Sequence, residues 1–294
     1  MRISYCIARV RIWEFMKIAV LGAGNMGSAL LGGILKAGVV AVGDARATTF
    51  SEARAAEVRS RLGVSVTAGG NAAAAAGADI VVLAVKPGTV PKVVKEIRDV
   101  LNEGQILISL AAMLPIRAIE DAAQCRMPVF RAMPNIPVVV EEGAIGICHN
   151  ALATLEHRAQ VESIFRAVGV TAFVDEEQMD AVTALSGSGP AYIYMVIEAM
   201  MAAGVKMGLS REISLRLSEQ TVLGAAKHAR ESGLHPAILR DQVITPGGTT
   251  IAAIHELERH GLRSMLISAI ETATIHAGKR TDVLLAEIER QKHT

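Results

Sequence analysis

The sequence predicts an α/β fold in which a doubly wound, mostly parallel sheet is followed by an all-helical second part. Three observations support this prediction. A glycine-rich turn follows a short, wholly apolar run near the start of the chain. Further apolar runs of strand length alternate with helical stretches up to about residue 175, and beyond that point only helical spacing is found. Such alternation is typical of doubly wound sheets.

Length and composition agree with a globular chain of two domains. The chain has 294 residues, of which 51% are hydrophobic and 20% charged, and domains average roughly 150 residues. Its 30 Lys and Arg against 29 Asp and Glu leave a net charge of +1, which gives no electrostatic support for nucleic-acid binding. The cysteines lack the spacing of a zinc motif or a disulfide framework, so we expect no metal and a cytoplasmic chain.

The N-terminus carries no recognisable targeting segment. Residues 1–15 contain arginines but no apolar core of signal-peptide length. We therefore expect residues 1–15 to be a dispensable, disordered extension and Met16 to open the folded part. The uncharged stretches at 18–35 and 181–197 are interrupted by glycines, so no membrane span is expected.

The first expected strand, Ile18–Leu21, leads into the turn GAGNMG and then into a helix that Gly38 closes. Gly22 permits the tight turn, Gly24 allows close approach of a pyrophosphate, and Gly27 allows the helix to pack on the strand. Free amides and the helix dipole then favour phosphate groups. The turn predicts dinucleotide binding by a Rossmann-type domain.

The second strand has two possible registers. If residues 39–42 form it, Asp44 ends the strand and binds the ribose 2′-OH of NAD. If residues 45–49 form it, the strand end presents groups that suit the 2′-phosphate of NADP: Thr49, Ser51 and Arg54. Periodicity does not decide between the two.

Three further strands are expected at 80–85, 106–110 and 129–132, with a helix at 90–101. Lys86 and Pro87 follow the first of these, where side chains of a parallel sheet face the ligand crevice. Asn135, in the turn after the last, is placed to reach a nicotinamide or to brace its own loop. Both interpretations stay open.

The second part of the chain is expected to be a series of apolar helices, a pattern that favours dimerisation. The first begins at Pro190 and ends before Gly204. The later helix boundaries follow from capping residues and glycines: Ser210 to Gly233, a short helix from Pro236, Thr249 or Thr250 to Gly261, and a last helix capped by Ser264.

Two glycine-rich segments open helices in this part, at residues 185–191 and 245–250. The second reads TPGGTT, with two glycines before two threonines. Free amides and hydroxyls at a positive helix end suit a carboxylate. Capping alone would need one threonine, so we interpret TPGGTT as a functional loop.

Six motifs in order make the chain resemble pyrroline-5-carboxylate reductases from Met16 to about Lys279: GAGNMG, AVKPG, RAMPN, LSGSGPAY, GVKMGL and TPGGTT. The resemblance implies reduction of 1-pyrroline-5-carboxylate to L-proline, the final step of proline biosynthesis. It implies NADP as cofactor, with NADPH preferred and NADH possible. It also implies the later strand register, so that Thr49 lies by the NADP phosphate and Asp44 does not bind. The partner is then a small-molecule substrate, and the chain forms a homo-oligomer, a dimer that can assemble into a decamer.

Motifs and resemblance together give the candidate site. The cofactor-binding candidates are Gly22, Ala23, Gly24, Asn25, Met26, Gly27, Thr49, Ser51, Arg54, Asn71, Ala84, Val85, Lys86, Pro87, Leu110, Ala111, Ala112 and Asn135. The substrate candidates are Gly248, Thr249, Thr250 and Glu176. Thr250 is the catalytic candidate, because its hydroxyl is expected to contact the ring nitrogen. The chain departs from the family pattern where it has Thr245, Gln242 and Ile136.

The mechanism implied needs little acid–base chemistry, because a protonated imine is already electrophilic and the protein has to hold donor and acceptor in place. A β-hydroxyacid dehydrogenase would need a lysine soon after the GSG turn, and none occurs before Lys206. A non-catalytic NADP-binding sensor would have no use for TPGGTT. The expected organisation is an extension at 1–15, a dinucleotide-binding domain at 16–175 and a helical substrate and dimerisation domain at 176–294.

Overall fold

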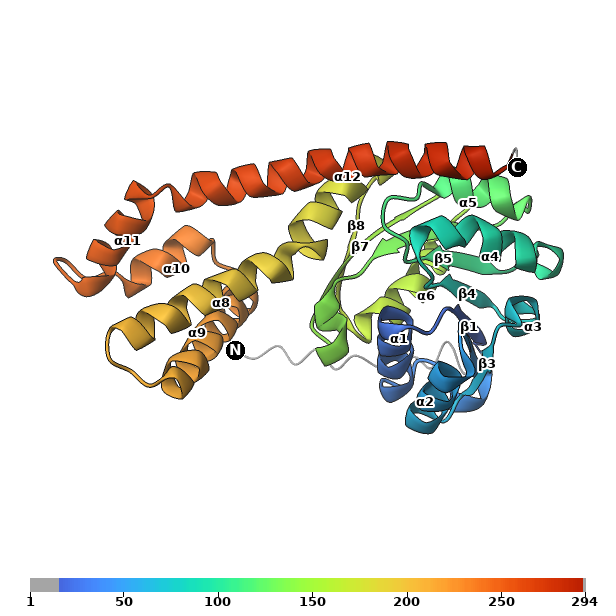
Figure 1. Cartoon of the computed structure of the whole chain (residues 1–294), viewed down its shortest axis with the longest axis horizontal. Helices are drawn as coiled ribbons and strands as arrows, with labels where there is room; N and C mark the ends of the chain where they lie inside the picture. The colour runs from blue at the N-terminus through green and yellow to red at the C-terminus, as the bar shows by residue number, and fades with distance from the viewer. Residues whose placement is uncertain (1–15, 293–294) are drawn as a thin grey trace. The chain divides into compact units, whose positions relative to one another are not determined.

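The computed structural model describes residues 16–292. Within them, one sheet runs in the order β3-β2-β1-β4-β5-β6-β7-β8 (Figure 1). Its strands are β1 (Ile18–Leu21), β2 (Ala45–Thr49), β3 (Ser65–Ala68), β4 (Ile80–Leu83), β5 (Ile106–Ser109), β6 (Val129–Met133), β7 (Gly143–His149) and β8 (Gly169–Phe173). The extension predicted at residues 1–15 lies outside the described residues.

The sheet is parallel from β3 to β6 and turns antiparallel between β6 and β7. Because β1 lies between β2 and β4, the chain reverses its winding direction at β1 and β4. Ligands of doubly wound sheets bind outside the carboxyl ends of the strands at such a switch point. The predicted fold class is confirmed, and the glycine turn after β1 lies at this position.

Helices cover both faces of the sheet, so it has two hydrophobic cores (Figure 1). One core packs the sheet against α1 (Asn25–Lys36), α2 (Glu52–Leu62) and α6 (Leu155–Arg166). The other packs it against α3 (Asn71–Ala75), α4 (Val90–Ile97) and α5 (Ile116–Ala123). β1, β4 and β5 are buried along their whole length, as their continuous apolar runs predict.

The second strand takes the later of the two registers. β2 pairs with β1 so that Ile18 faces Ala45 and Leu21 faces Thr48, and Thr49 ends the strand. Asp44 lies in a 3₁₀ turn before the strand begins, at the end of the sheet away from the glycine loop. The alternative strand at 39–42 is therefore wrong.

The helical part confirms several predicted boundaries and corrects two. Its elements are α7 (Met179–Val182), a π-helical turn (Thr183–Gly187), α8 (Gly189–Lys206), α9 (Arg211–Ser232), α10 (Pro236–Val243), α11 (Thr249–Arg259) and α12 (Leu262–Lys292). Ser210 caps α9 and Gly233 ends it with φ 64°, as predicted.

α8 does not stop before Gly204. A Cβ there would lie 2.6 Å from Ser214 Oγ, so the glycine serves close packing of α8 on α9 and not helix termination. Nor does Ser264 cap the last helix. α12 already begins at Leu262, and the Ser264 hydroxyl donates back to the Gly261 carbonyl.

The described chain forms two compact units. The first contains the residues up to Gly187 and those from Thr274 onward, and the second contains Ser188–Ala273. The domain boundary expected near residue 175 stays a prediction, and the last part of α12 belongs to the first unit. The reason is that the end of α12 carries apolar side chains, Leu284 and Ile288, that are buried in the second core of the sheet.

Candidate functional site

The glycine loop between β1 and α1 has the geometry of a phosphate-binding turn. Gly22 has φ 94°, and a Cβ at Gly27 would lie 2.7 Å from the Gly22 carbonyl oxygen, so neither position tolerates a side chain. A Cβ at Gly24 would have no heavy atom within 4 Å, which means that the loop is open to a ligand there. α1 has no side-chain cap and no acidic residue in its first turn. The loop therefore fits a dinucleotide pyrophosphate.

Thr48 anchors this loop to β2. Its carbonyl accepts from the amides of Gly22 (3.1 Å) and Ala23 (2.7 Å), and its hydroxyl accepts from the Gly22 amide (3.2 Å). The same hydroxyl donates to Asn71 Oδ1 (2.7 Å), while Asn71 Nδ2 donates to Glu96 (2.7 Å). The amide of Asn71 is thus used at both ends. Sequence reasoning missed Thr48 and Glu96, because only the strand register brings them to the loop.

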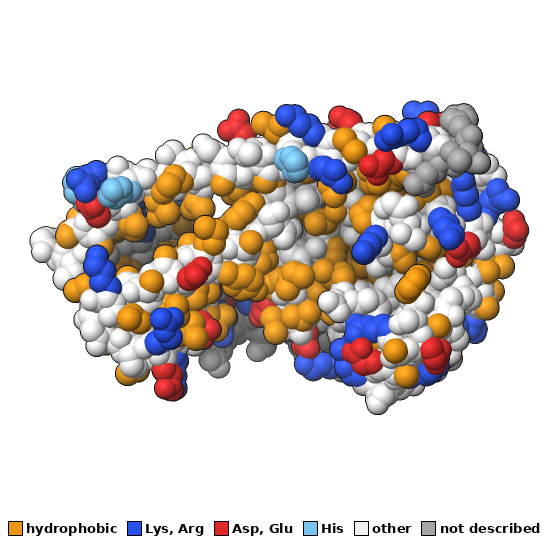
Figure 2. Space-filling view, viewed as in Figure 1, with side chains coloured by type: hydrophobic (Ala, Val, Ile, Leu, Met, Phe, Trp, Pro, Cys, Tyr) orange, Lys and Arg blue, Asp and Glu red, His pale blue; other side chains and the backbone are white. Residues whose placement is uncertain are grey.

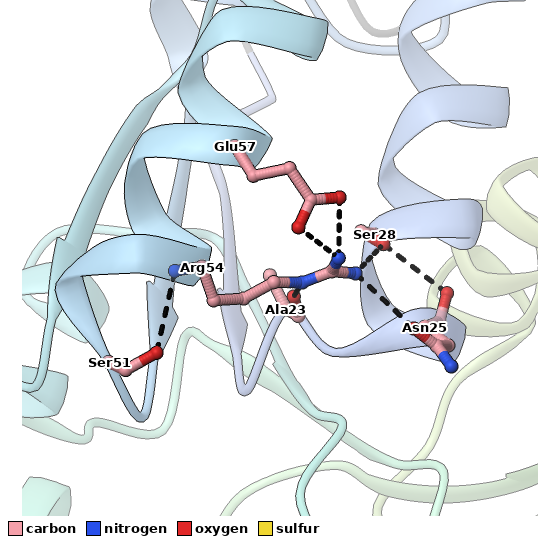
Figure 3. Close-up of polar contacts among 6 residues, drawn as sticks. All are labelled: Ala23, Asn25, Ser28, Ser51, Arg54 and Glu57. Atoms are coloured by element: carbon pink, nitrogen blue, oxygen red, sulfur yellow. Dashed lines mark hydrogen bonds and ion pairs between the residues drawn. The ribbon is translucent and has the colours of Figure 1, made fainter.

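The end of β2 presents Thr49 and Ser51 beside the glycine loop. Thr49 is buried and its hydroxyl donates to the Ser51 carbonyl (3.0 Å). Ser51 caps α2 by accepting from the Arg54 amide (3.4 Å). The Arg54 side chain turns toward the glycine loop, where its nitrogens contact Ala23, Asn25 and Ser28 (Figure 3).

The segments after β4 and β5 lie at the same edge of the sheet. Residues 84–87 follow β4, and the Ala84 amide donates to the Leu21 carbonyl (2.8 Å). Val85 contacts Gly22 closely enough to leave no room for a Cβ. Residues 110–112 follow β5, where the Leu110 amide donates to the Leu83 carbonyl (2.9 Å). The first unit thus brings these cofactor candidates together at one edge.

Asn135, after β6, is a buried brace. Its Nδ2 donates to the Ser186 carbonyl in the π-helical turn (2.9 Å), and its Oδ1 accepts from the Ala144 amide at β7 (2.9 Å). Both ends of the side-chain amide are therefore occupied within the protein. Of the two interpretations left open by the sequence, these contacts favour bracing.

Glu176 is held by the sheet and by α5. Its Oε1 lies 3.5 Å from Nη1 of the buried Arg131 and accepts from the Ile116 amide (2.7 Å). Arg131 Nε has no hydrogen-bond partner among the described residues. Burial, reinforced by the Glu176 carboxylate, raises the pKa of the neighbouring Cys148 thiol to about 12, so this cysteine is a neutral core residue.

The TPGGTT loop, in the second unit, opens α11. Gly247 has φ 67°, and Gly248 is the N-cap residue, without a side-chain cap. Its amide donates to the Thr245 carbonyl (3.0 Å). Neither the Thr249 nor the Thr250 hydroxyl has a hydrogen-bond partner in the described part of the chain. The first amides of α11 and both hydroxyls are therefore available to an anionic ligand.

Residues 16–292 contain neither a cluster of metal ligands nor a membrane-spanning helix. No group of three or more His, Cys, Asp or Glu side chains there could hold a metal ion. No helix in the same range is long and apolar enough to cross a membrane.

Comparison with known proteins gives matches along nearly the whole chain. Residues 17–113 match the family model described as NADP oxidoreductase, coenzyme F420-dependent, and residues 176–279 match that of pyrroline-5-carboxylate reductase dimerisation. The chain is 43% identical over 261 residues to a pyrroline-5-carboxylate reductase of Methanosarcina acetivorans, covering 89% of this chain and 96% of that one.

Two solved structures are similar over most of the chain. A pyrroline-5-carboxylate reductase from Coxiella burnetii superposes with a TM-score of 0.86 at 37% identity, covering 90% of this chain and 98% of its own. A Plasmodium falciparum pyrroline carboxylate reductase with NADP bound gives a TM-score of 0.80 at 32% identity with the same coverage.

Proposed function

This chain belongs to the pyrroline-5-carboxylate reductase family, and from that membership we propose that it reduces 1-pyrroline-5-carboxylate to L-proline, the final step of proline biosynthesis. The observation that supports this most strongly is the 43% identity to a named reductase over 96% of that protein's length. The chain is accordingly an oxidoreductase that acts on a small molecule.

The cofactor is NADP, with NADPH preferred and NADH possible. When bound, it supplies a hydride to the carbon of the substrate's C=N bond. The amides of the glycine loop and the N-terminus of α1 hold the pyrophosphate, because Gly24 is open to a ligand and no acidic residue repels it in the first turn. The strand-end segments at residues 84–87 and 110–112 line the rest of the cofactor site.

The TPGGTT loop receives the substrate. The Gly248 amide donates to the Thr245 carbonyl, so the amides of Thr249 and Thr250 at the start of α11 hold the carboxylate, since two N–H donors at a positive helix end match a planar anion. The Thr250 hydroxyl contacts the ring nitrogen. Thr250 is half-buried on α11, and a hydrogen bond to a group that carries charge is stronger than one between neutral groups.

The remaining candidates act by shaping the site. Glu176 is bound through Oε1 to Arg131 and to the start of α5, so it supports these loops in addition to the substrate contact expected of it. Asn135 likewise supports the π-helical turn. With a protonated imine as acceptor, the protein supplies orientation and exclusion of water, and no general base is needed.

The chain forms a homo-oligomer through its helical unit. Each helix of that unit exposes large apolar side chains: Ile193, Met195, Leu217, Leu223, Ile238, Leu257 and Ile267. Hydrophobic side chains are visible on the face of the molecule drawn in Figure 2. Exposed apolar surface of this extent marks an interface. The assembly is a dimer that associates further into a decamer, and its location is cytoplasmic.

A turnover assay tests this function. Purified protein is mixed with 1-pyrroline-5-carboxylate and either NADPH or NADH, and cofactor oxidation is followed together with the appearance of L-proline. We expect one proline per cofactor oxidised and a higher kcat/KM with NADPH. Binding of both cofactors without proline formation would instead support a non-catalytic NADP-binding sensor.

A further inference from the structure

The Arg54 side chain crosses from α2 to the glycine loop (Figure 3). Its Nε donates to the Ala23 carbonyl at 3.3 Å, and its Nη2 donates to Ser28 Oγ at 3.1 Å and to Asn25 Oδ1 at 3.5 Å. Ser28 is 2% exposed and also donates to the Asn25 carbonyl. One guanidinium thus contacts the loop itself and the first turn of α1.

Glu57 occupies the remaining nitrogen. Both of its carboxylate oxygens accept from Arg54 Nη1, at 2.6 and 2.7 Å, and the two residues lie one turn apart on α2. All the nitrogens of the guanidinium therefore have partners. A phosphate beyond the end of β2 would have to draw Arg54 away from the loop and from Glu57 together.

Holding the glycine loop in one conformation lowers the entropy cost of binding a ligand there. Three of the six residues in GAGNMG are glycines, which lose more backbone entropy on ordering than any other residue. A side chain that holds the Ala23 carbonyl sets the orientation of the peptide that leads into Gly24. Binding sites that are ordered beforehand avoid this entropy cost when the ligand arrives.

We propose that Arg54 is a positioning residue that orders the glycine loop for NADPH and NADH alike, and that Glu57 keeps it in that place. This inference rests on the proposed function of the loop as a dinucleotide site. It differs from the role expected for Arg54 from the sequence, contact with the 2′-phosphate, because a phosphate ligand would affect NADPH alone.

The test compares Arg54→Ala, Arg54→Lys and Glu57→Gln with the unaltered chain. Arg59→Ala is the matched control, since Arg59 is also on α2 and also ion-paired, with Glu52, but donates to the Val66 carbonyl on β3. Dissociation constants for NADPH and NADH are measured from cofactor fluorescence without substrate. Values of kcat and KM and the melting temperature without cofactor are recorded for each variant.

We expect Arg54→Ala to weaken both cofactors by the same factor, about tenfold, equivalent to about 1.4 kcal/mol, with kcat little changed. Arg54→Lys should resemble Arg54→Ala, because an ammonium cannot span Ala23, Ser28 and Glu57 as the planar fork does. Glu57→Gln should give a smaller loss that is again equal for the two cofactors. Arg59→Ala should leave both dissociation constants unchanged.

Several results would overturn the inference. A loss confined to NADPH would make Arg54 a ligand of the 2′-phosphate, and full rescue by Arg54→Lys would reduce its role to charge. Unchanged dissociation constants in Arg54→Ala would mean that Arg54 only forms a surface ion pair with Glu57. Equal losses in Arg59→Ala would indicate general destabilisation of α2. If the unaltered chain binds both cofactors but makes no proline, the proposed function fails while the binding comparison still decides the role of Arg54.

Discussion

At the scale of single residues, many polar side chains of the candidate site already have partners inside the protein. Asn71 joins Thr48 to Glu96, and Asn135 joins β7 to the π-helical turn. These residues shape the site. Among the described residues, each unit also offers unpaired groups at a helix start: the backbone amides at α1 in the first, and the amides and threonine hydroxyls at α11 in the second.

Thr250→Val tests the one side chain assigned to the reacting nitrogen. Valine keeps the shape and removes only the hydroxyl. Losing a hydrogen bond to a charged group costs about 1.5–3 kcal/mol, which corresponds to a fall of roughly 10- to 150-fold in kcat/KM. Steady-state kinetics measure the fall, and the dissociation constant for NADPH should stay unchanged.

Thr221→Val is the control for this variant, because Thr221 lies on α9 of the same unit and its hydroxyl donates within that helix, to the Leu217 carbonyl. Normal kcat/KM in Thr250→Val, or weaker NADPH binding with intact chemistry, would remove Thr250 from the mechanism.

Cys148 gives the protein a pH-dependent stability in the alkaline range. Burial raises its thiol pKa from 9.0 to about 12, so between these values the unfolded state releases a proton that the folded state keeps. Stability from this group is complete below pH 9 and falls as the pH rises, by at most about 1.36 kcal/mol per pH unit.

Urea unfolding over about three pH units, from about pH 8 to about pH 11, checks this. Other groups also titrate in this range, so Cys148→Ala is measured alongside for comparison. The unaltered chain should lose stability more steeply than the variant. Parallel pH profiles for the two proteins would show that Cys148 is not shielded as described.

At the scale of elements, two glycines of the loop between β1 and α1 have different roles. Gly27 is closed in by the Gly22 carbonyl and by Ala84, whereas Gly24 faces open space. Glycine is thus needed for packing at position 27 and for ligand approach at position 24, and substitutions distinguish the two roles.

Gly24→Ala should leave the melting temperature without cofactor almost unchanged and weaken NADPH binding more than about tenfold, since its Cβ occupies the approach of the phosphate. Gly27→Ala should destabilise the fold by about 1–3 kcal/mol, because its Cβ overlaps backbone. Thermal unfolding and fluorescence titration distinguish the two. The account of the loop fails if Gly24→Ala unfolds early or binds NADPH normally.

Apart from β2, whose register periodicity left open, the strands that sequence reasoning located have mostly apolar runs, as a sheet covered on both faces requires. β3 and β8 lack such runs because they lie at the edges of the sheet, where alternate residues are exposed. β7 was missed because Gly143 and Gly146 look like loop residues. They are needed in the strand because a Cβ would meet Val138 and Val182, each at 2.5 Å.

The parts of the candidate site that could be predicted from the sequence are those formed by neighbouring residues. GAGNMG and TPGGTT are local patterns whose chemistry is contained in a few neighbouring residues. Thr48, Glu96 and Glu57 were not identified, because they depend on strand pairing and on which face of α2 meets the loop. The partners of Asn135 and Glu176 are likewise distant in sequence, so no spacing rule points to them.

At the scale of the whole molecule, the helical unit is the part whose apolar side chains a single chain leaves exposed. Its helices expose large apolar side chains, among them Leu217 on α9, at 55%. Within the described residues of the sheet-containing unit, by contrast, β1, β4 and β5 are buried throughout. Association of the helical unit with a second copy would cover this surface.

Leu217→Glu should therefore dissociate the assembly, because a buried unpaired carboxylate is costly at an apolar interface. Sedimentation at micromolar concentration is expected to show a dimer or larger for the unaltered chain and a smaller species for the variant. Leu155→Glu is the control, since Leu155 is an exposed leucine (81%) on α6 of the other unit. A monomeric unaltered chain would contradict assembly through these helices.

The most direct test of the central claim follows the hydride itself. The protein is supplied with NADPH carrying deuterium at the transferable C4 position and with unlabelled 1-pyrroline-5-carboxylate, and the L-proline formed is examined by mass spectrometry and NMR. Direct hydride transfer to the C=N carbon predicts one deuterium per proline, located at the ring Cδ. Proline without deuterium, or cofactor oxidation without proline, would contradict the account.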